Sequence, residues 1–233
     1  KLERIKYKKT PFKVGAPGLS RNMIIDDTPI DEYTHITFLD GDDIWIPEKL
    51  EIIVSKIREN KYIDIFSSNA IVSKTNNLFF QDPIDNTNVY FNLLLRGNSI
   101  ITSTVLIKSN ILKKNRFNEN FLYSNDMELW LRVIGGLRYY YIHKPLIIYT
   151  IRDNSLTSRG RYLQIYNEIR IIKRELRKNN FTQKEIKSIK NRISSLFEIS
   201  SYKVIVDSNS SLLQRTKITL MSILFNPFKL KRY

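Results

Sequence analysis

The sequence predicts an α/β protein with a mixed sheet flanked by helices, followed by a basic, helical C-terminal appendage. Up to residue 155, apolar runs rich in β-branched and aromatic residues alternate with amphipathic helical patterns. From residue 156 to residue 233 the patterns are helical, and the charge changes with them. Residues 151–233 carry 18 Lys and Arg against 6 Asp and Glu, whereas residues 1–150 carry 20 against 17. We therefore expect an α/β domain over 1–155 and a basic α-helical region over 156–233.

The composition excludes several classes of protein. The 233 residues are 42% hydrophobic and 12% aromatic, enough for a packed core, so wholesale disorder is excluded. The absence of Cys excludes a disulfide scaffold, a zinc ribbon, an iron–sulfur site and a thiolate nucleophile. Two His argue against a His-based triad or a His-rich metal centre. A bound metal should therefore have oxygen ligands, which favours Mg²⁺, Mn²⁺ or Ca²⁺.

Neither a membrane span nor a signal peptide is expected. The sequence contains no run of about 20 consecutive apolar residues, which a spanning helix needs. The first residues, Lys1-Leu2-Glu3-Arg4, include neither Met nor the apolar core of a signal peptide. We therefore expect a cytoplasmic chain that is a fragment of a longer one.

The first elements lead to an acidic cluster. After a turn at residues 15–18, a short helix is expected to start near Ser20, its N-cap, and to run through residues 23–25. Residues 33–39 (YTHITFL) predict a buried strand. The strand ends in Asp40-Gly41-Asp42-Asp43. Pro47 suits the first turn of a helix, and its apolar face is expected at Leu50, Ile53, Val54 and Ile57. The cluster should then lie at the carboxyl end of a strand, where open α/β sheets bind ligands.

The later elements alternate in the same way. Strands are expected at residues 63–66, 70–72, 103–107, 139–142 and 146–151. A helix over 89–95 should end at Gly97, and a second should open at Asn125 and stop at Gly135, after a loop over 117–123.

The basic region is expected to hold amphipathic helices. One apolar face consists of Tyr162, Ile165, Tyr166, Ile169, Ile172 and Leu176. Thr182-Gln-Lys-Glu185 predicts a capping box that opens the next helix. A third amphipathic stretch ends at Asn226-Pro227.

The acidic cluster is the strongest chemical signal. Three carboxylates within four residues repel one another unless a cation or several donors compensate them. Asp40 and Asp42 are spaced to reach one hard cation, or to divide between a metal and a ribose, and a divalent ion can bridge a diphosphate. A turn capped by an Asp would explain Asp43 alone. An EF-hand loop is excluded, because Trp45 stands where that loop needs Gly.

Three motifs in order suggest a family. FLDGDDIWIPEKLE (38–51) is preceded by Gly18-Leu-Ser-Arg21-Asn22 and followed by NDMELWLR (125–132). Together they resemble the family 2 glycosyltransferases of the GT-A fold, inverting enzymes that use nucleotide-activated sugars. The resemblance extends from about residue 15 to residue 157. It implies a Rossmann-like GT-A sheet and the transfer of a sugar from a nucleotide-sugar to a hydroxyl acceptor, in bacterial surface polysaccharide or glycolipid synthesis.

The resemblance also implies roles for individual residues. Asp40 and Asp42 fall on the DxD motif, where Asp40 would face the ribose or metal and Asp42 would hold Mg²⁺ or Mn²⁺. Arg21 and Asn22 fall on an Arg-Asn pair beneath the nucleotide. Asp126 falls on the catalytic base, a role that suits a carboxylate at a helix N-terminus, although a plain N-cap would explain it too.

Two departures alter the expected site. The pattern often has Glu where this chain has Asn125. In the closing segment Tyr149-Thr-Ile-Arg152, Arg152 replaces a His that is sometimes a metal ligand. An Arg cannot bind a metal but can clamp a diphosphate, so we expect a thinner protein shell around the metal. His35 and His143 are interpreted as structural, and Trp130 as either core or acceptor-facing.

The front of the chain departs most from the family. Nothing before Gly15 resembles the family's opening strands and nucleotide-binding loop. A parallel sheet without its central strands leaves edges unpaired. We therefore expect the 233-residue chain to fold poorly or to pair its sheet edge with another chain, and to bind nucleotide weakly.

The partners follow from the same resemblance. We expect a metal-dependent hexosyltransferase with a UDP-sugar donor and a saccharide or lipid-linked acceptor. The basic region would suit a peripheral position on the inner face of the cytoplasmic membrane. Two alternatives stay open: a basic nucleic-acid-binding module, suggested by the pI of 9.8, and a non-catalytic remnant of the enzyme. Because no nucleic-acid-binding signature accompanies the charge, we expect no nucleic acid partner.

Overall fold

The computed structural model describes residues 7–10, 17–80, 88–152, 161–178, 181–206 and 216. It divides into two compact units. The first comprises Lys1–Tyr90 and Ile100–Ile151, and the second Phe91–Ser99 and Arg152–Tyr233. The boundary near residue 155 stays a prediction, as does the third helical stretch, which lies outside the described residues apart from Thr216.

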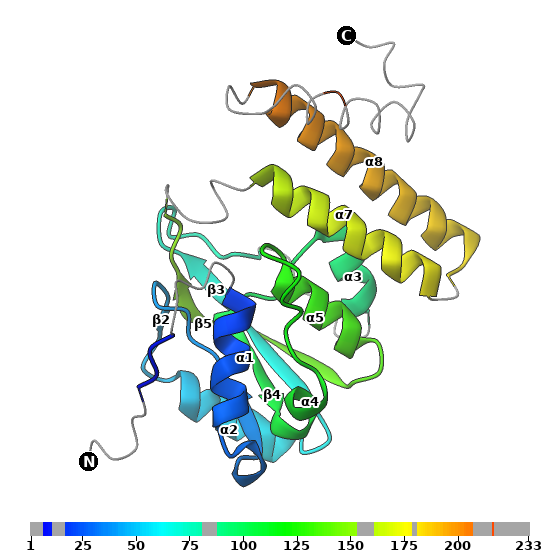
Figure 1. Cartoon of the computed structure of the whole chain (residues 1–233). Coiled ribbons are helices and arrows are strands. Elements are labelled where there is room, and N and C mark those ends of the chain that lie inside the picture. Colours follow the sequence, from blue (N-terminus) through cyan, green and yellow to red (C-terminus); the bar gives the residue numbers. More distant parts are fainter. Residues whose placement is uncertain are drawn as a thin grey trace. The chain divides into compact units, whose positions relative to one another are not determined.

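The first unit is built on a mixed, curled sheet of five strands, which confirms the α/β class (Figure 1). In sheet order the strands are β1 (His35–Thr37), β4 (Leu106–Lys108), β3 (Ile65–Val72), β5 (Tyr139–Tyr149) and β2 (Ile44–Trp45). The central pair β3 and β5 is parallel, and the other neighbours are antiparallel. This arrangement puts β1 and β2, the strands on either side of the acidic cluster, at opposite ends of the sheet.

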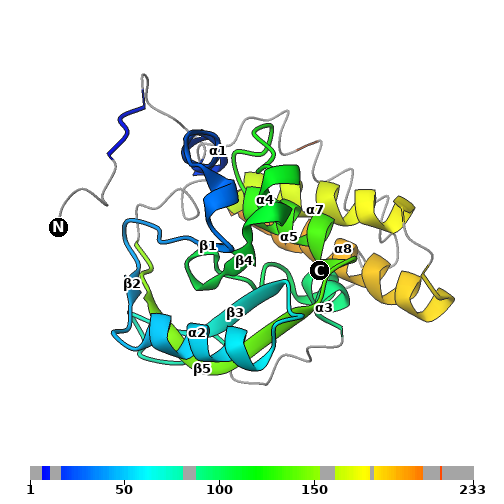
Figure 2. The ribbon, with the colours of Figure 1, turned by 90° about the horizontal axis from the view of Figure 1, so that it is seen from below.

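Helices flank both faces of this sheet (Figure 2). One face packs on α2 (Lys49–Glu59), where Ile53 meets Phe66, Leu106 and Leu146 in a buried apolar cluster. Toward the other side lie α1 (Pro17–Asp27), α4 (Ser109–Lys114) and α5 (Asn125–Ile134). Two short 3₁₀ turns, η1 (Ile30–Glu32) and η2 (Thr102–Thr104), belong to the same unit.

The helix beginning at Asn125 and the loop over 117–123 are confirmed. The helix expected near Ser20 is confirmed, but Ser20 is not its N-cap, because α1 already begins at Pro17. A proline suits the first helical position, since its fixed φ matches the helix and its missing N–H has no partner to lose.

The strand predictions need correction. The strands expected over 63–66 and 70–72 are one strand, β3, which begins only at Ile65, and those expected over 139–142 and 146–151 are one strand, β5, which ends at Tyr149. The polar residues that interrupt the pattern are buried inside β3 and are satisfied there: the Asn69 side-chain oxygen accepts the N–H groups of Ala70 and Phe80. The register also shifts at Asn69, so neither strand shows unbroken apolar alternation.

The strand before the acidic cluster is shorter and less buried than expected. Only His35–Thr37 pair, with β4, and all three residues are half-buried. Tyr33 and Leu39 are each 50% exposed, because the strand lies at the edge of the described sheet. The expected strand over 103–107 begins as η2 instead, and β2 was not predicted at all.

The apolar face of α2 is also rotated from its expected position. Ile53 is buried and Ile57 half-buried, as predicted, but Leu50 and Val54 are exposed. Their place on the inner face is taken by Lys49, which is completely buried.

The second unit contains two long helices, α7 (Arg161–Lys178) and α8 (Gln183–Val206), that pack together. Ile165, Ile169 and Ile172 are buried as predicted, whereas Tyr166 is exposed. The capping box is confirmed: Thr182 Oγ1 accepts the N–H of Glu185, and the Glu185 carboxylate accepts the N–H of Thr182.

Most of helix α3 (Val89–Arg96) also belongs to the second unit, which includes Phe91–Ser99. The helix ends at Gly97, as predicted, with Gly97 at a φ of +87°. Among the helices of the described residues, none is both long and apolar enough to cross a membrane.

Candidate functional site

Residues 40–43, here called the acidic turn, are held at their buried end by Asp43. The turn closes through a hydrogen bond of 3.0 Å from the N–H of Asp43 to the carbonyl of Asp40. The Asp43 carboxylate accepts the hydroxyl of Ser103 at 2.6 Å and the N–H of Thr150 at 3.0 Å. Burial raises the pKa of this carboxyl despite these bonds. Asp43 therefore anchors the turn and caps no helix, contrary to the interpretation from sequence.

Arg21 compensates the opposite end of the acidic turn. Its guanidinium donates to Asp40 Oδ1 at 2.5 Å and lies 5.2 Å from the centre of the Phe117 ring. The Asp40 side chain is 40% exposed, and Asp42 is half-buried on the same turn. The structure therefore brings two of the predicted donor-binding residues, Arg21 and Asp40, into direct contact.

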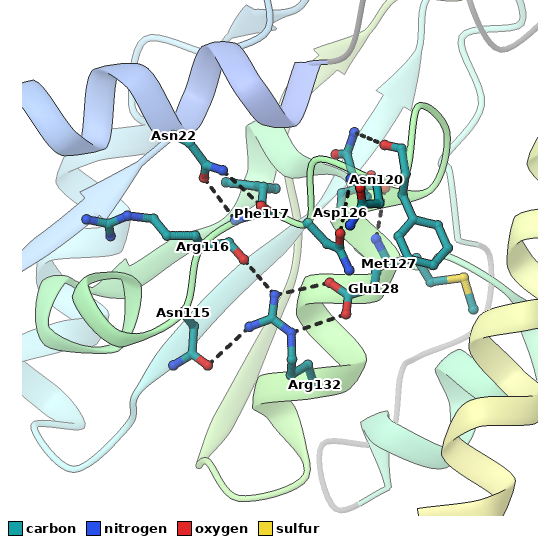
Figure 3. A network of polar contacts seen from close by, with 12 residues as sticks. Asn22, Asn115, Arg116, Phe117, Asn120, Asp126, Met127, Glu128 and Arg132 are labelled. Carbon is teal, nitrogen blue, oxygen red and sulfur yellow. Dashed lines mark hydrogen bonds and ion pairs between the residues drawn. The ribbon is translucent and has the colours of Figure 1, made fainter.

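Asn22 points elsewhere. Its amide donates to the carbonyl of Phe117 and to Glu119, both at 2.8 Å, and its oxygen accepts the Phe117 N–H at 2.9 Å (Figure 3). Asn22 is buried, and its side chain fastens α1 to the loop before α5. Its predicted contact with a nucleotide stays a prediction.

The turn η2 connects the acidic turn with Asp126. The hydroxyl of Ser103, besides donating to Asp43, accepts the N–H of Asp40 at 3.0 Å. The preceding residue, Thr102, directs its hydroxyl to Asp126 Oδ2 at 3.5 Å. Two consecutive side chains thus touch the acidic turn and the predicted base, which are more than 80 residues apart in the sequence.

Asp126 lies in the first turn of α5. Its Oδ1 accepts the N–H of Met127 at 2.8 Å, and the side chain is half-buried rather than enclosed (Figure 3). A helix N-terminus favours the ionised carboxylate, so this oxygen pair can receive a proton from a neighbouring hydroxyl.

Tyr149, at the end of β5, faces the same group of acids. Burial raises the pKa of its phenol, and the negative charges of Asp43, Asp126, Asp42 and Asp40 raise it further. A protonated phenol therefore lies near all four carboxylates and can donate a hydrogen bond among them. From the sequence, Tyr149 stands out only as the first residue of the closing segment, and its position among these acids depends on the tertiary fold.

Lys49 and Trp45 donate hydrogen bonds to backbone carbonyls of η2. The Lys49 ammonium donates to the carbonyl of Ser103 at 3.0 Å and to that of Thr104 at 3.4 Å. The indole N–H of Trp45 also donates to the Ser103 carbonyl, at 3.1 Å. Sequence reasoning missed Lys49, because a lysine beside an amphipathic helical face is normally assigned to solvent.

The rest of the NDMELWLR motif is structural. Arg132 donates to Glu128 at 3.1 and 3.2 Å, to the Asn115 side chain at 3.3 Å and to the carbonyl of Arg116 at 2.6 Å (Figure 3). Glu128 is only 1% exposed. This network fastens α5 to the segment after α4. Trp130 is completely buried, so it belongs to the core and not to an acceptor surface.

A cavity of about 300 Å³ lies beside the site, between α1 and β1. Apolar side chains such as Ile24, Ile36 and Phe38 form most of its wall, and Arg21 contributes its side chain next to Asp40. Neither Asp42 nor Asp126 lines it.

The described residues contain no group of three or more His, Cys, Asp or Glu side chains arranged for a metal ion. Both Asp43 oxygens accept hydrogen bonds from protein donors, so the carboxylates that remain as metal ligands are those of Asp42 and Asp40. Asp40 would first have to be released from Arg21. Two carboxylates fit a cation that takes most of its ligands from a bound diphosphate. The predicted Mg²⁺ or Mn²⁺ therefore stays a prediction.

Arg152 is exposed and falls in the second unit, so its predicted contact with a diphosphate also stays a prediction.

Comparison with known proteins finds relatives among the glycosyltransferases. No model of a known protein family matches the chain. An uncharacterized glycosyltransferase of Methanocaldococcus jannaschii is 28% identical over 163 residues, which cover 67% of this chain and 55% of that protein. The UDP-Glc:alpha-D-GlcNAc-diphosphoundecaprenol beta-1,3-glucosyltransferase WfgD of Escherichia coli is 30% identical over 131 residues, covering 56% and 49% respectively.

This chain is similar to glycosyltransferases. It spans about half the length of the curated relatives that it matches. The crystal structure of the S. aureus protein TarS shares its fold, with a TM-score of 0.60 at 14% sequence identity, over 94% of this chain and 62% of that one. The similarity confirms the fold class expected from the sequence.

Proposed function

We propose that this chain carries out, or is the catalytic part of a protein that carries out, the inverting transfer of a sugar from a nucleotide-sugar to a hydroxyl acceptor. The observation that carries the proposal is the junction at η2, where Ser103 contacts the acidic turn and Thr102 contacts Asp126. A donor diphosphate and an acceptor hydroxyl must lie side by side for direct displacement. The similarity to glycosyltransferases supports the reaction class.

In the proposed reaction Asp126 is the general base. Its carboxylate takes the proton of the acceptor hydroxyl as that oxygen forms a bond to C1 of the sugar. The bond from C1 to the diphosphate breaks on the opposite face, and the nucleoside diphosphate leaves with the electron pair, which inverts the configuration at C1.

The acidic turn is proposed to hold the donor. Asp42, with Asp40, would hold a Mg²⁺ or Mn²⁺ ion, which when bound compensates the charge of the leaving diphosphate. Arg21 and Asn22 are proposed to lie beneath the nucleotide, and Arg152 to steady the diphosphate.

The donor and acceptor follow from the relative whose name states them. We propose a UDP-hexose donor and a saccharide carried on a lipid diphosphate, in bacterial surface polysaccharide synthesis. The second unit supports attachment to an anionic membrane surface at the inner face, because α7 and α8 carry six exposed basic side chains: Arg170, Arg177, Lys178, Lys184, Lys187 and Lys190.

A panel of sugar nucleotides with Mn²⁺ or Mg²⁺ tests this function, scored for binding and for transfer to lipid-linked saccharides. We expect turnover with a UDP-hexose that is lost in Asp42→Asn and kept in Asp31→Asn, a matched change at an exposed carboxylate paired with Lys113. Absence of binding and transfer with every donor, in the chain and in a longer protein that contains it, would reject the proposal.

A further inference from the structure

Lys49 is a buried charge that the proposed reaction does not use. It is the first residue of α2, and its side chain has no exposed surface. Within the described part of the chain, its recorded partners are the carbonyls of Ser103 and Thr104 and the face of the Trp45 ring, 5.1 Å away. None of them carries a negative charge.

Such an arrangement is costly for the fold. Moving an ammonium out of water without a carboxylate partner disfavours its charged form, and burial lowers the pKa of Lys49 to about 8. An apolar side chain of similar volume at the start of α2 would avoid this cost. The position of the ammonium therefore calls for a reason other than stability.

The reason lies in what Lys49 holds. The segment η2 is a 3₁₀ turn of three residues, closed by the bonds Thr104 N–H to Ile101 and Val105 N–H to Thr102. A turn this short has weak internal hydrogen bonding and depends on outside contacts for its position. Two side chains from one neighbouring segment, Trp45 and Lys49, end on the carbonyl of Ser103.

That carbonyl belongs to the residue that organises the acidic turn. The hydroxyl of Ser103 meets the Asp43 carboxylate and the Asp40 N–H, and its neighbour Thr102 meets Asp126. A displacement of η2 would therefore move the contacts of donor-binding and base residues together.

We propose that Lys49 is a positioning residue. Its buried ammonium fixes the position of η2, so that Ser103 and Thr102 hold the acidic turn and Asp126 at a fixed position relative to each other. Its effect on catalysis rests on the proposed function, but its effect on the geometry does not. The group acts through η2 and touches neither donor nor acceptor.

The test compares Lys49→Met with Lys56→Met in the intact chain. Lys56 stands on the same helix two turns later, and its partly exposed side chain pairs with Glu59, so it is a matched control. Amide hydrogen exchange is read at Asp40 and Thr150, whose N–H groups bond Ser103 Oγ and the Asp43 carboxylate. Unfolding midpoint, kcat and donor KM are measured on the same samples.

We expect Lys49→Met to keep or raise the unfolding midpoint while exchange at Asp40 and Thr150 becomes faster. Its kcat should fall by about tenfold or more with little change in KM, and Lys56→Met should match the parent. Parental exchange and parental kcat in Lys49→Met would overturn the proposal. If neither the parent nor a longer protein that contains it binds or uses any donor, the proposed function fails, while the exchange measurement still decides the positioning role.

A second variant covers the case in which Lys49→Met does not fold. Lys49→Arg keeps the cation but does not lose its proton in the accessible pH range. The parent should lose activity above about pH 8, and Lys49→Arg should not. A decline at the same pH in both would overturn the proposal.

The other titratable groups around η2 and Lys49 are the carboxylates of the acidic turn, of Asp126 and of Glu48, and the phenol of Tyr149, whose pKa is raised by burial.

Discussion

The hydroxyl of Ser103 donates to the carboxylate of Asp43 across 2.6 Å, between residues 60 positions apart in the chain. This bond ties the 3₁₀ turn that carries Thr102 to the turn that carries Asp40 and Asp42. Both ends of the proposed reaction, the leaving diphosphate and the acceptor proton, therefore depend on the position of one short segment.

Removing this hydroxyl should weaken both the fold and the site. In Ser103→Ala the buried Asp43 carboxylate loses a donor that lowers its pKa, and the Asp40 N–H loses its acceptor. We expect a loss of about 1–3 kcal/mol in the free energy of unfolding, measured by urea denaturation. Ser55→Ala, at an exposed serine of α2, should change it little. Equal unfolding curves for the two variants would contradict the anchoring role of Ser103.

The charge of Lys49 should make stability depend on pH in the alkaline range. Its pKa is about 8 in the folded protein and 10.5 unfolded, so between these values the unfolded chain binds more protons. Stability should therefore rise with pH from about 8 to about 10.5, by up to about 3 kcal/mol. Urea titrations of the parent and of Lys49→Met test this; a rise of the same size in both would show that other groups cause it.

Gly97 should be needed for its conformation and for space. Its φ is +87°, and an added Cβ would lie 3.1 Å from Glu168 Oε1 and 3.3 Å from Arg192 Nη2, two atoms of an ion pair. We expect Gly97→Ala to lower the free energy of unfolding by about 1–2 kcal/mol and to disturb this pair. Gly136→Ala, where an added Cβ meets nothing within 4 Å, is the matched control. Thermal melting followed by helical circular dichroism measures both, and a Gly97→Ala curve no lower than the control would refute the expectation.

Asp126 should be required for turnover but not for folding. Asparagine can keep the bond to the Met127 N–H through its oxygen, but it cannot take a proton. We expect Asp126→Asn to lower kcat by about 10² to 10⁴ with an unchanged melting temperature and unchanged donor binding. Initial rates with the active donor give the result. A variant that keeps more than about half of parental kcat would remove Asp126 from the role of base.

Local signals in the sequence account for much of the fold. The helix from Asn125, the helix end at Gly97 and the capping box at Thr182 all appear where they were predicted, because a cap or a helical period is encoded within a few neighbouring residues. The two interrupted strands were each predicted as two strands, because the burial of their polar residues depends on contacts with distant parts of the chain. The burial of Asn69 depends on a distant segment that satisfies it, which no local pattern reports.

The candidate site also has a part that the sequence determined and a part that only the tertiary structure decided. The sequence alone determined that Asp40 and Asp42 follow a strand and that Asp126 opens a helix. The tertiary structure alone decided the strand order, the pairing of Arg21 with Asp40, and the meeting of Thr102, Ser103 and Lys49 between them. These side-chain contacts join residues from 19 to 54 positions apart, and they form only where burial of the sheet faces offsets the entropy of closing such loops.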